Sequence, residues 1–298
     1  MPAKYFECPN GNVVAITQCL NKCPTGQRCM FLPTLRAIAQ ASDRKLDKPS
    51  ATELICGTRE TYLKRTTDYT INPQKQIYPL HGSAAHTINE GFTQGDILAE
   101  ERLFDDISSG KFDMYGNLLN NSEGILGDIK VTGSYKLMKA LGLYKVDILT
   151  GQYYKSGNRK GEQKTIKQLR SDGVKWLLEW AVQLNYYRIL LETYGFEVKK
   201  MVIQAICRDN SLRMAAERGI DQSVYLIPIN KISDSWIMRY MSKKHQMLKA
   251  ALTNEQLPAV CKPKERWHDR KCLDYCNVAE HCPHGQQLKL ITQVEKTA

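Results

Sequence analysis

The sequence has no long apolar segment and no low-complexity segment. No stretch approaches the roughly 20 consecutive apolar residues that a membrane-spanning helix needs, so we expect no membrane partner. The first residues, MPAKYFECPNGNVV, also lack the apolar centre of a secretory signal. These absences lead us to expect a cytoplasmic, reducing environment. The chain has 298 residues, which is enough to bury a full core.

A repeated cysteine spacing is the most conspicuous feature that is present. Eight of the ten cysteines form two quartets, in which successive cysteines are separated by 10, 3 and 5 residues. The quartets are Cys8, Cys19, Cys23 and Cys29 near the start, and Cys261, Cys272, Cys276 and Cys282 near the end. Disulfide-dense frameworks belong to short secreted chains, so we expect these thiols to bind metal. Four thiolates are typical ligands of Zn²⁺ and of iron–sulfur clusters.

The charge of the chain is strongly positive, with a formal net charge of +11. Binding to a polyanion releases the counterions condensed on its phosphates, so this balance favours a nucleic-acid partner. The excess is local in places, since residues 155–170 carry six cations and one glutamate. We interpret this segment as a solvated loop that leads into a helix, or as a phosphate contact.

Between the quartets, the pattern predicts a mixed α/β domain. Apolar periodicity predicts helices at 30–42, 51–65, 81–107, 134–142, 171–194 and 231–252. The helical segment 81–107 is expected to be interrupted near Gly91 and Gly95. Short apolar runs predict strands at 110–117, 124–131, 196–209 and 223–230, of which the first two form a hairpin. Two prolines predict a loop at 66–80. The predicted domains are an N-terminal four-cysteine module with a helix (1–43), an α/β core (50–252) and a C-terminal cysteine cluster (253–298).

Three charged residues are expected to meet on the predicted hairpin. Period-two geometry puts Asp128 and Lys130 on one face of their strand, and Asp113 on the paired strand can face them. Carboxylate oxygens suit Mg²⁺ or Mn²⁺. The ammonium could position or help to deprotonate an attacking water, or stabilise charge on a phosphate. Taken alone, an Asp–Lys pair on a strand is more often a surface ion pair.

Other motifs surround this set in a fixed order. They are CGTRETYL at 56–63, Gly82-x3-His86, Gly110-x2-Asp113, Asp128-Ile129-Lys130 and Gln183-x3-Tyr187. The ordered set resembles the PD-(D/E)XK nuclease superfamily, specifically its RecB-type branch, which includes the RecB and AddB nuclease domains and the CRISPR adaptation exonucleases. The resemblance covers about residues 50–283. It implies a restriction-endonuclease-like core, in which helices flank a small mixed sheet, with cysteine-metal knots at both termini.

The resemblance implies a metal site and a catalytic lysine. Asp113, Asp128 and the carbonyl oxygen of Ile129 would hold Mg²⁺ or Mn²⁺, and Lys130 would act at the attacking water. His86 would be a further ligand, and its nitrogen would shift the preference towards Mn²⁺. The alternative for this residue is a buried or capping histidine.

Further residues would support this site. Gln183 and Tyr187 lie four apart in one predicted helix and would steady the site or the DNA strand, or they simply face the core. Glu100 or Glu101 could support the metal ligands, although a salt bridge on a helix surface is the plainer role. The helix that starts at Ser134 is expected to contact the DNA backbone beside the cut.

Two ligand sets compete for the C-terminal cysteines. RecB-type nucleases often carry a 4Fe–4S cluster, and the resemblance makes Cys56 its fourth ligand beside Cys272, Cys276 and Cys282. The repeated spacing instead makes Cys261 the fourth ligand. At the C-terminal cysteines we expect either a 4Fe–4S cluster or Zn²⁺. At the N-terminal quartet we expect Zn²⁺ or an iron–sulfur cluster.

The function that follows is a divalent-metal-dependent DNA nuclease that acts on single strands or duplex ends, with structural metal sites at its cysteines. An alternative is a non-catalytic nucleic-acid-binding protein, in which zinc modules sit on an inactive nuclease fold. A third possibility is a subunit that cuts only with a helicase, recombinase or integrase partner.

Overall fold

The computed structural model describes residues 3–42, 47–119, 123–175 and 177–297. Residues 120–122, in the predicted turn between the strands at 110–117 and 124–131, lie outside the described residues, as does Trp176 of the predicted helix 171–194. The chain forms two compact units. The first unit comprises Met1–Ile88, Glu101–Lys111 and Ser233–Ala298, and the second comprises Asn89–Glu100 and Phe112–Ile232. The domain boundaries inferred from the sequence stay a prediction.

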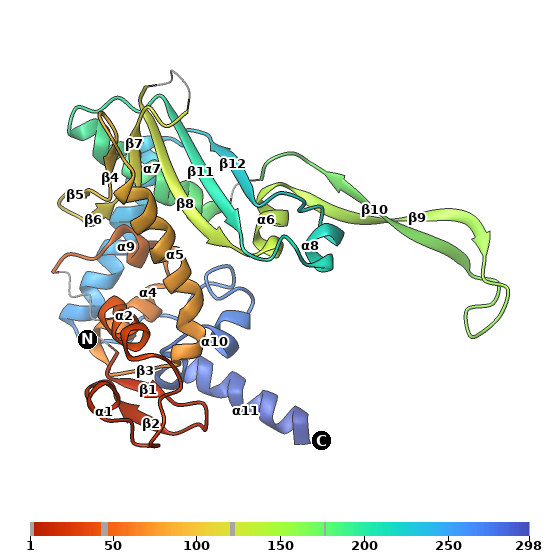
Figure 1. Cartoon of the computed structure of the whole chain (residues 1–298), viewed down its shortest axis with the longest axis horizontal. Helices are drawn as coiled ribbons and strands as arrows, with labels where there is room; N and C mark the ends of the chain where they lie inside the picture. The colour runs from red at the N-terminus through yellow and green to blue at the C-terminus, as the bar shows by residue number, and fades with distance from the viewer. Residues whose placement is uncertain (1–2, 43–46, 120–122, 176, 298) are drawn as a thin grey trace. The chain divides into compact units, whose positions relative to one another are not determined.

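A five-stranded mixed sheet forms the centre of the second unit (Figure 1). Its strands, in spatial order, are β12 (Val224–Ile229), β11 (Lys200–Cys207), β8 (Ile125–Thr132), β7 (Met114–Gly116) and β4 (Leu98–Ala99). The central strand β8 pairs in parallel with β11 and antiparallel with β7. Its Ile and Leu residues are buried, as expected for a strand with a neighbour on each side. The predicted antiparallel pairing of the residues around 115 and 126 is therefore confirmed.

Three helices belong to the second unit, namely α6 (Ser134–Ala140), α7 (Leu178–Thr193) and α8 (Arg213–Glu217). Helix α7 packs against β8 and buries ten of its side chains, among them Leu184 and Leu191. Helix α6 follows β8 directly and packs against β11. The chain is thus mixed α/β with small sheets flanked by helices, which confirms this part of the predicted fold class.

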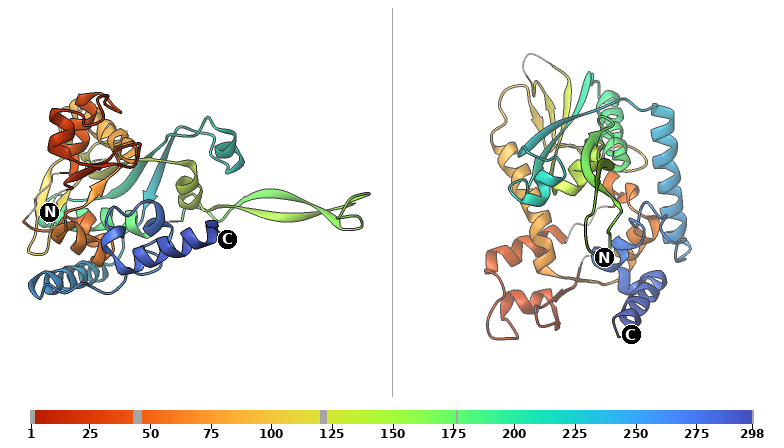
Figure 2. Two further views of the ribbon diagram at one scale, coloured as in Figure 1. Left: turned by 90° about the horizontal axis from the view of Figure 1, so that it is seen from below. Right: turned by 90° about the vertical axis from the view of Figure 1, so that its right-hand side faces the viewer.

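The second unit also carries a long two-stranded hairpin, β9 (Leu143–Tyr153) and β10 (Gln163–Ser171), which we call the arm. It extends away from the five-stranded sheet in Figure 1 and in the left-hand view of Figure 2. The loop predicted from residue 155 is confirmed as far as 162, at the tip of the arm, but the helix start predicted up to 170 was wrong, because 163–170 belongs to β10. The predicted helix 171–194 correspondingly begins only at Leu178. The arm is mostly exposed on both faces, so it lacks the alternation of apolar and polar residues that identifies a half-buried strand.

The first unit contains two small sheets and most of the helices. Its strands are β1 (Tyr5–Glu7), β2 (Val13–Ala15), β3 (Thr70–Ile71), β5 (Arg102–Phe104) and β6 (Ser109–Lys111). Its helices are α1 (Ile16–Asn21), α2 (Leu32–Ser42), α3 (Ala51–Ile55), α4 (Thr58–Thr66), α5 (Pro73–Gly91, whose end lies in the second unit), α9 (Asp234–Thr253), α10 (Arg270–Asp274), the 3₁₀ helix η1 (Ala279–His281) and α11 (Pro283–Thr297). Among the described residues, no helix combines the length and apolar composition that crossing a bilayer requires.

Three predictions between residues 51 and 107 were wrong in part. The loop predicted at 66–80 is largely helix α5, which starts at Pro73 and contains Pro79. Proline suits the first position of a helix, where its missing N–H is not needed. Helix α5 ends at Gly91, where the prediction placed an interruption. The helix predicted to continue to residue 107 was wrong, because short strands follow. The helix predicted at 51–65 is broken into α3 and α4 at Cys56 and Gly57.

Candidate functional site

Strand β8 places Asp128 and Lys130 side by side in the second unit. Residues two apart on a strand point to the same face, and the Lys130 ammonium lies 2.8 Å from both carboxylate oxygens of Asp128. Asp128 is 2% exposed and the Lys130 side chain is 22% exposed. A surface ion pair would be exposed on both sides, so the burial of Asp128 makes this pair different from the common one.

Asp113 is held against the same strand by a backbone hydrogen bond. The N–H of Ile129 donates to Asp113 Oδ2 at 2.6 Å, and the Asp113 side chain is buried. The single strand predicted at 110–117 was wrong, because β6 and β7 belong to different sheets and Asp113 lies between them. The break turns Asp113 towards β8, where its carboxylate reaches the backbone between Asp128 and Lys130.

Glu100 is a further acidic residue near Asp113. Its backbone N–H donates to the Asp113 carbonyl oxygen at 2.9 Å, and carboxylate oxygens of the two residues lie within 4.8 Å of each other. Glu100 has a left-handed φ of 56°, which is costly for a residue with a side chain and often marks a functional site. Sequence reasoning favoured a surface role, because it expected a helix where Glu100 follows the short strand β4.

The electrostatics of this site keep Lys130 charged. Burial by itself would lower the pKa of Lys130, because it disfavours the charged ammonium. The Asp128 and Asp113 carboxylates have a larger, opposite effect, so the pKa of Lys130 is raised above its ordinary value. Asp128 Oδ2 is buried and accepts no hydrogen bond from the described residues, although the Lys130 nitrogen lies near it. Buried carboxylate oxygens with unused acceptor capacity are suited to a hard divalent cation.

Helix α7 carries the two other predicted residues of the second unit. Gln183 Nε2 donates to Tyr187 Oη at 3.1 Å, as expected for residues four apart on a helix. Burial raises the pKa of Tyr187, whose hydroxyl also senses the charges of Lys130, Asp128 and Asp113. The structure therefore brings Tyr187 into the electrostatic surroundings of the carboxylate–lysine set, although the two residues also fill the inner side of α7.

His86 and the start of α6 were also expected to contribute to the site. His86 is half-buried on α5 and belongs to the first unit, which ends two residues later at Ile88. At the start of α6, the Ser134 backbone N–H and hydroxyl both donate to Asp209, at 2.6 and 2.9 Å. A carboxylate thus already occupies the helix end that the sequence suggested for a DNA phosphate.

The carboxylate set fits a divalent cation. Asp113 and Asp128 flank the Ile129 backbone, Glu100 adds a third carboxylate, and all three are oxygen donors of the kind that Mg²⁺ and Mn²⁺ prefer. Three carboxylates and one ammonium leave an excess of negative charge, which a bound cation would neutralise.

The C-terminal cysteines surround a small cavity in the first unit. This cavity has a volume of about 30 Å³, and its lining includes Cys261, Cys272, Cys276 and Cys282. Cys56 is not among the described residues that line it. Burial raises the pKa of Cys276 to about 11, so an empty site would hold a neutral thiol there. Arg59 donates to Cys282 Sγ at 3.7 Å, as suits a sulfur that becomes a thiolate on binding metal.

Gly57 provides the space for Cys261. A Cβ atom at Gly57 would lie 2.3 Å from Cys261 Sγ, which is much closer than such atoms can approach. The φ of Gly57 is −61°, so the backbone conformation would accept other residues and only the contact requires glycine. The break between α3 and α4 thus makes room for the fourth cysteine, which sequence reasoning did not recognise.

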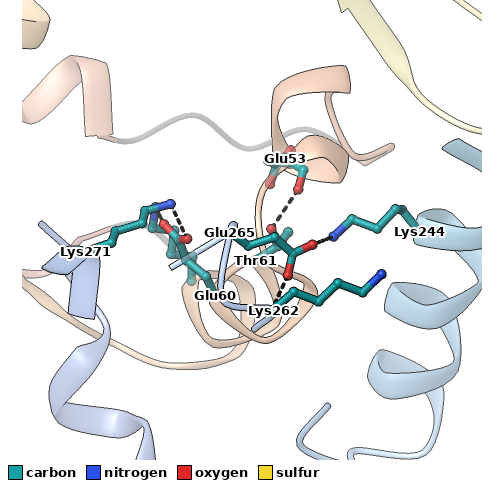
Figure 3. A network of polar contacts seen from close by, with 8 residues as sticks. Glu53, Glu60, Thr61, Lys244, Lys262, Glu265 and Lys271 are labelled. Carbon is teal, nitrogen blue, oxygen red and sulfur yellow. Dashed lines mark hydrogen bonds and ion pairs between the residues drawn. The ribbon is translucent and has the colours of Figure 1, made fainter. Parts of the chain in front are cut away.

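Buried ion pairs connect the wall of this cavity to the surrounding helices (Figure 3). Glu60 on α4 accepts from Lys271 at 2.6 Å and from Lys64 at 2.7 Å. Burial raises the pKa of Glu60, but Lys64 and Lys271 outweigh it and hold the pKa at about 2. Glu265 accepts from Lys244 on α9 at 2.7 Å and from the Lys262 N–H at 2.8 Å. These contacts fix the irregular segment that carries Cys261 and the short helix α10 that carries Cys272.

A histidine and an aspartate also lie near the C-terminal cysteines. Ligand atoms of Asp269, Cys272 and His284 lie within 4.8 Å of one another, and His284 Nε2 is 2.7 Å from Asp269 Oδ1. Arg266 donates to the same aspartate oxygen. The three consecutive residues 267–269 have left-handed φ values between 52° and 75°, a strained path that brings Asp269 to this position.

The N-terminal quartet forms a separate group in the first unit. Burial, followed by the nearby Cys29 and Cys23, raises the pKa of Cys8, and the other three thiols likewise raise that of Cys19. Cys23 instead has a lowered pKa, because Thr25 donates to its sulfur. The four thiols are therefore close enough for their charges to interact. In neither quartet, among the described residues, do three sulfur atoms lie within 4.8 Å of one another, so metal binding by the cysteines stays a prediction.

Comparisons with other proteins add no assignment to this geometry. No protein-family model, no curated protein and no solved structure matches the chain. The functional conclusion therefore depends on the residues themselves.

Proposed function

We propose that the chain is a divalent-metal-dependent DNA nuclease. The observation that carries the proposal is the arrangement of Asp113, Asp128 and Lys130, in which two buried carboxylates flank one peptide of β8 and an ammonium lies beside them. The ordered motifs of the sequence support a restriction-endonuclease-like core of the RecB type. The positive net charge of +11 supports a nucleic-acid substrate.

The residues have distinct roles in this proposal. Asp113 and Asp128 would hold Mg²⁺ or Mn²⁺, with the Ile129 carbonyl as a further oxygen ligand. A bound cation would polarise a phosphate oxygen and make the attacking water easier to deprotonate. Glu100 joins the proposed set because its carboxylate is near that of Asp113. His86 is kept as an additional ligand, as the sequence motif implies.

Lys130 would act as a fixed positive charge. Its raised pKa keeps it protonated at neutral pH, which suits stabilisation of the negative charge that develops on the phosphate during hydrolysis. A bound divalent cation would oppose this rise, because it neutralises the carboxylates that cause it. Gln183 and Tyr187 would hold the inner side of α7 against this site and orient the strand that is cut.

The cysteine sites would have a structural role. The cavity lined by Cys261, Cys272, Cys276 and Cys282 supports a four-thiolate site that holds Zn²⁺ or a 4Fe–4S cluster, and it favours Cys261 over Cys56 as the fourth ligand. The N-terminal quartet would bind Zn²⁺ or an iron–sulfur cluster in the same way. Neither site lends a residue to hydrolysis in this proposal.

Cleavage of labelled DNA tests the proposed function. We expect the wild-type protein to cut end-labelled single-stranded or duplex DNA with Mn²⁺ or Mg²⁺ and to stop when the metal is chelated. Asp128→Ala and Lys130→Ala should lose this activity while remaining folded. Undiminished cleavage by both variants would refute the assignment of the site. DNA binding by the wild type without cleavage under any metal would favour the non-catalytic alternative.

A further inference from the structure

The arm formed by β9 and β10 is exposed along most of its length in the part of the chain that the structure describes. Its two strands pair with each other, and most of their residues are exposed on both faces. Three large apolar side chains along it, Leu149, Tyr153 and Ile166, are 57–62% exposed. A two-stranded hairpin is at best marginally stable alone in water, so an arm of this length indicates an element that is stabilised by a partner.

The charge of the arm identifies the chemistry of that partner. From Leu143 to Ser171 the sequence has seven cations and two acidic residues, which leaves a net charge of +5. Six of these cations are exposed. The register puts Lys145 and Lys167 on one face of the ribbon and Arg170 on the other. Positive charge on both faces suits a position between two rows of phosphates, and it disfavours pairing with the arm of a second copy.

The tip of the arm combines cations with aromatic rings. Arg159 lies over the Tyr154 ring at 4.6 Å from its centroid, and Lys164 lies over the same ring at 5.6 Å. Tyr153 beside them is exposed. Arginine and tyrosine side chains of this kind can contact phosphates and sugars while their planar groups remain ordered.

The root of the arm is firmly attached to the second unit. A Cβ atom at Gly219 would lie 2.3 Å from Leu169 Cδ2 and 3.3 Å from Leu143 Cδ1, so both leucines pack closely on this glycine. The Asp172 N–H donates to the Gly142 carbonyl oxygen at 3.0 Å directly below the strands. The arm is therefore held at one end and exposed beyond it, as a binding element must be.

We propose that the arm lies in the major groove of duplex DNA. The major groove of B-form DNA, about 12 Å wide, admits a two-stranded β-ribbon. Eleven residues of β9 span roughly 36 Å at about 3.3 Å per residue, which is close to one turn of the double helix. The major groove of an RNA duplex is too narrow and deep for side chains to read, so DNA is the partner. The face of the ribbon that enters the groove would contact base edges through an exposed apolar side chain, Leu149 on one face or Ile166 on the other, and the cations would contact the flanking phosphates.

This inference rests on the proposed function only in taking the bound DNA to be the substrate. The arm and the carboxylates belong to the same unit, so a duplex held by the arm is presented by the same body that carries the proposed site. The substrate class becomes DNA with a duplex portion, instead of single strands alone.

Binding of a labelled duplex of about one and a half to two turns tests the arm. The protein is the full chain with Asp128→Asn, so that DNA is not cut during the measurement. The arm variant adds Lys155→Gln, Lys160→Gln and Lys167→Gln. The control adds Lys199→Gln, Arg213→Gln and Lys231→Gln, three exposed cations of the same unit outside the arm, so both variants lose three positive charges.

Fluorescence anisotropy should show weaker duplex binding by the arm variant, with Kd raised at least about tenfold and the salt slope reduced by about 2 to 3. Binding to a single strand of the same length should change less than about threefold, and the control should leave duplex binding near that of the parent. Equal loss by arm and control variants, equal loss on single and double strands, or a parent dimer that the arm substitutions dissociate would overturn the proposal.

Cleavage by the protein with Asp128 intact separates this inference from the proposed function. Metal-dependent cleavage of a short single strand, together with unchanged duplex binding by the arm variant, would refute the arm alone. Duplex binding through the arm without cleavage of any DNA would refute the nuclease and leave the arm as a DNA-binding element.

Discussion

The carboxylate site of the second unit and the cysteine cavity of the first unit differ in the backbone that carries them. Asp128 and Lys130 lie on a central strand with a neighbour on each side, and Asp113 is tied to it by the Ile129 N–H. Among the C-terminal cysteines, Cys272 lies on the short helix α10, Cys261 and Cys276 lie on irregular backbone, and Cys282 directly follows η1. Buried ion pairs around Glu60 and Glu265 fix this part of the chain. A regular strand positions groups without a ligand, whereas the segment with the cysteines would depend on the metal that we propose it binds.

This difference implies a division of roles. Removing a charge from the carboxylate site should abolish chemistry and leave most of the fold intact. Removing a ligand from the cysteine cavity should destabilise the fold and leave the hydrolytic step of folded molecules intact, because structural metal binding contributes directly to folding. The predictions below test this division.

The largest effect is expected for Asp113→Asn. Asparagine keeps an oxygen acceptor for the Ile129 N–H but loses the charge that would hold a divalent cation. Cleavage should fall at least about 100-fold in a metal-dependent DNA assay, with little change in the thermal midpoint. The control is Asp172→Asn, an exposed aspartate of the same unit, which should cut like the wild type. Equal rates for Asp113→Asn and the control would contradict the site.

The next effect distinguishes the two candidates for the fourth cysteine ligand. Cys261→Ser should remove the metal bound at the C-terminal quartet and lower the free energy of unfolding by at least about 3 kcal/mol, because that metal stabilises the fold. Cys56→Ser should keep the metal, since Cys56 does not line the cavity among the described residues. Metal analysis and absorption near roughly 400 nm, the region of iron–sulfur absorption, would report both. Loss of the metal in Cys56→Ser alone would reverse the assignment.

The ion pairs beside the cavity should make stability depend on pH through Glu60. Its pKa is held at about 2, below the ordinary 4.5, so its stabilising effect is complete above pH 4.5 and is lost as the pH falls towards 2. At neutral pH, Glu60→Gln should lower the free energy of unfolding by about 3 kcal/mol. Urea unfolding should be measured at several pH values. The difference in the free energy of unfolding between Glu60→Gln and the wild type should become smaller below pH 4.5.

Glu197→Gln is the matched control for this measurement, because Glu197 is 80% exposed and its nearest cation is 3.8 Å away. The free energy of unfolding of Glu197→Gln should be close to that of the wild type at every pH. A constant difference between Glu60→Gln and the wild type from pH 7 to pH 2 would contradict the ionic origin of the effect.

A smaller effect is expected for Gly57→Ala. The added Cβ would meet Cys261 Sγ at 2.3 Å, so the sulfur must move and the variant should lose about 1–3 kcal/mol together with part of its bound metal. Gly91→Ala is the control, because a Cβ there meets nothing within 4 Å. Thermal unfolding and metal content measured on both would test the contact, and identical values for the two variants would show that Cys261 does not need this space.

Much of the fold followed from local patterns, and the failures have physical causes. The strands around Asp128 and at 223–230 were predicted because their apolar residues are dense and bounded by turn residues. The arm was missed because a ribbon exposed on both faces has the composition of a loop. The first part of helix α5, up to residue 80, was missed because Pro73 and Pro79 were taken as breakers, although Pro73 is at the helix start.

The part of the site that depends on the alternation of side chains along one strand was predictable. The part that depends on contacts between residues far apart in the sequence was not. The shared face of Asp128 and Lys130 follows from period two. The contact of Asp113 with the Ile129 N–H requires the break between β6 and β7, and the approach of Glu100 requires a left-handed residue. The contact of Gly57 with Cys261 joins residues about two hundred positions apart, so no local pattern could show it.

The measurement that tests the account most directly compares Asp128→Asn with Cys276→Ser in one experiment. For each variant, DNA cleavage with Mn²⁺ is divided by the fraction of folded protein in the same sample. We predict that Asp128→Asn is folded but cuts at least about 100-fold more slowly, whereas Cys276→Ser is less stable but cuts at nearly the wild-type rate per folded molecule. Full cleavage by folded Asp128→Asn would contradict the account.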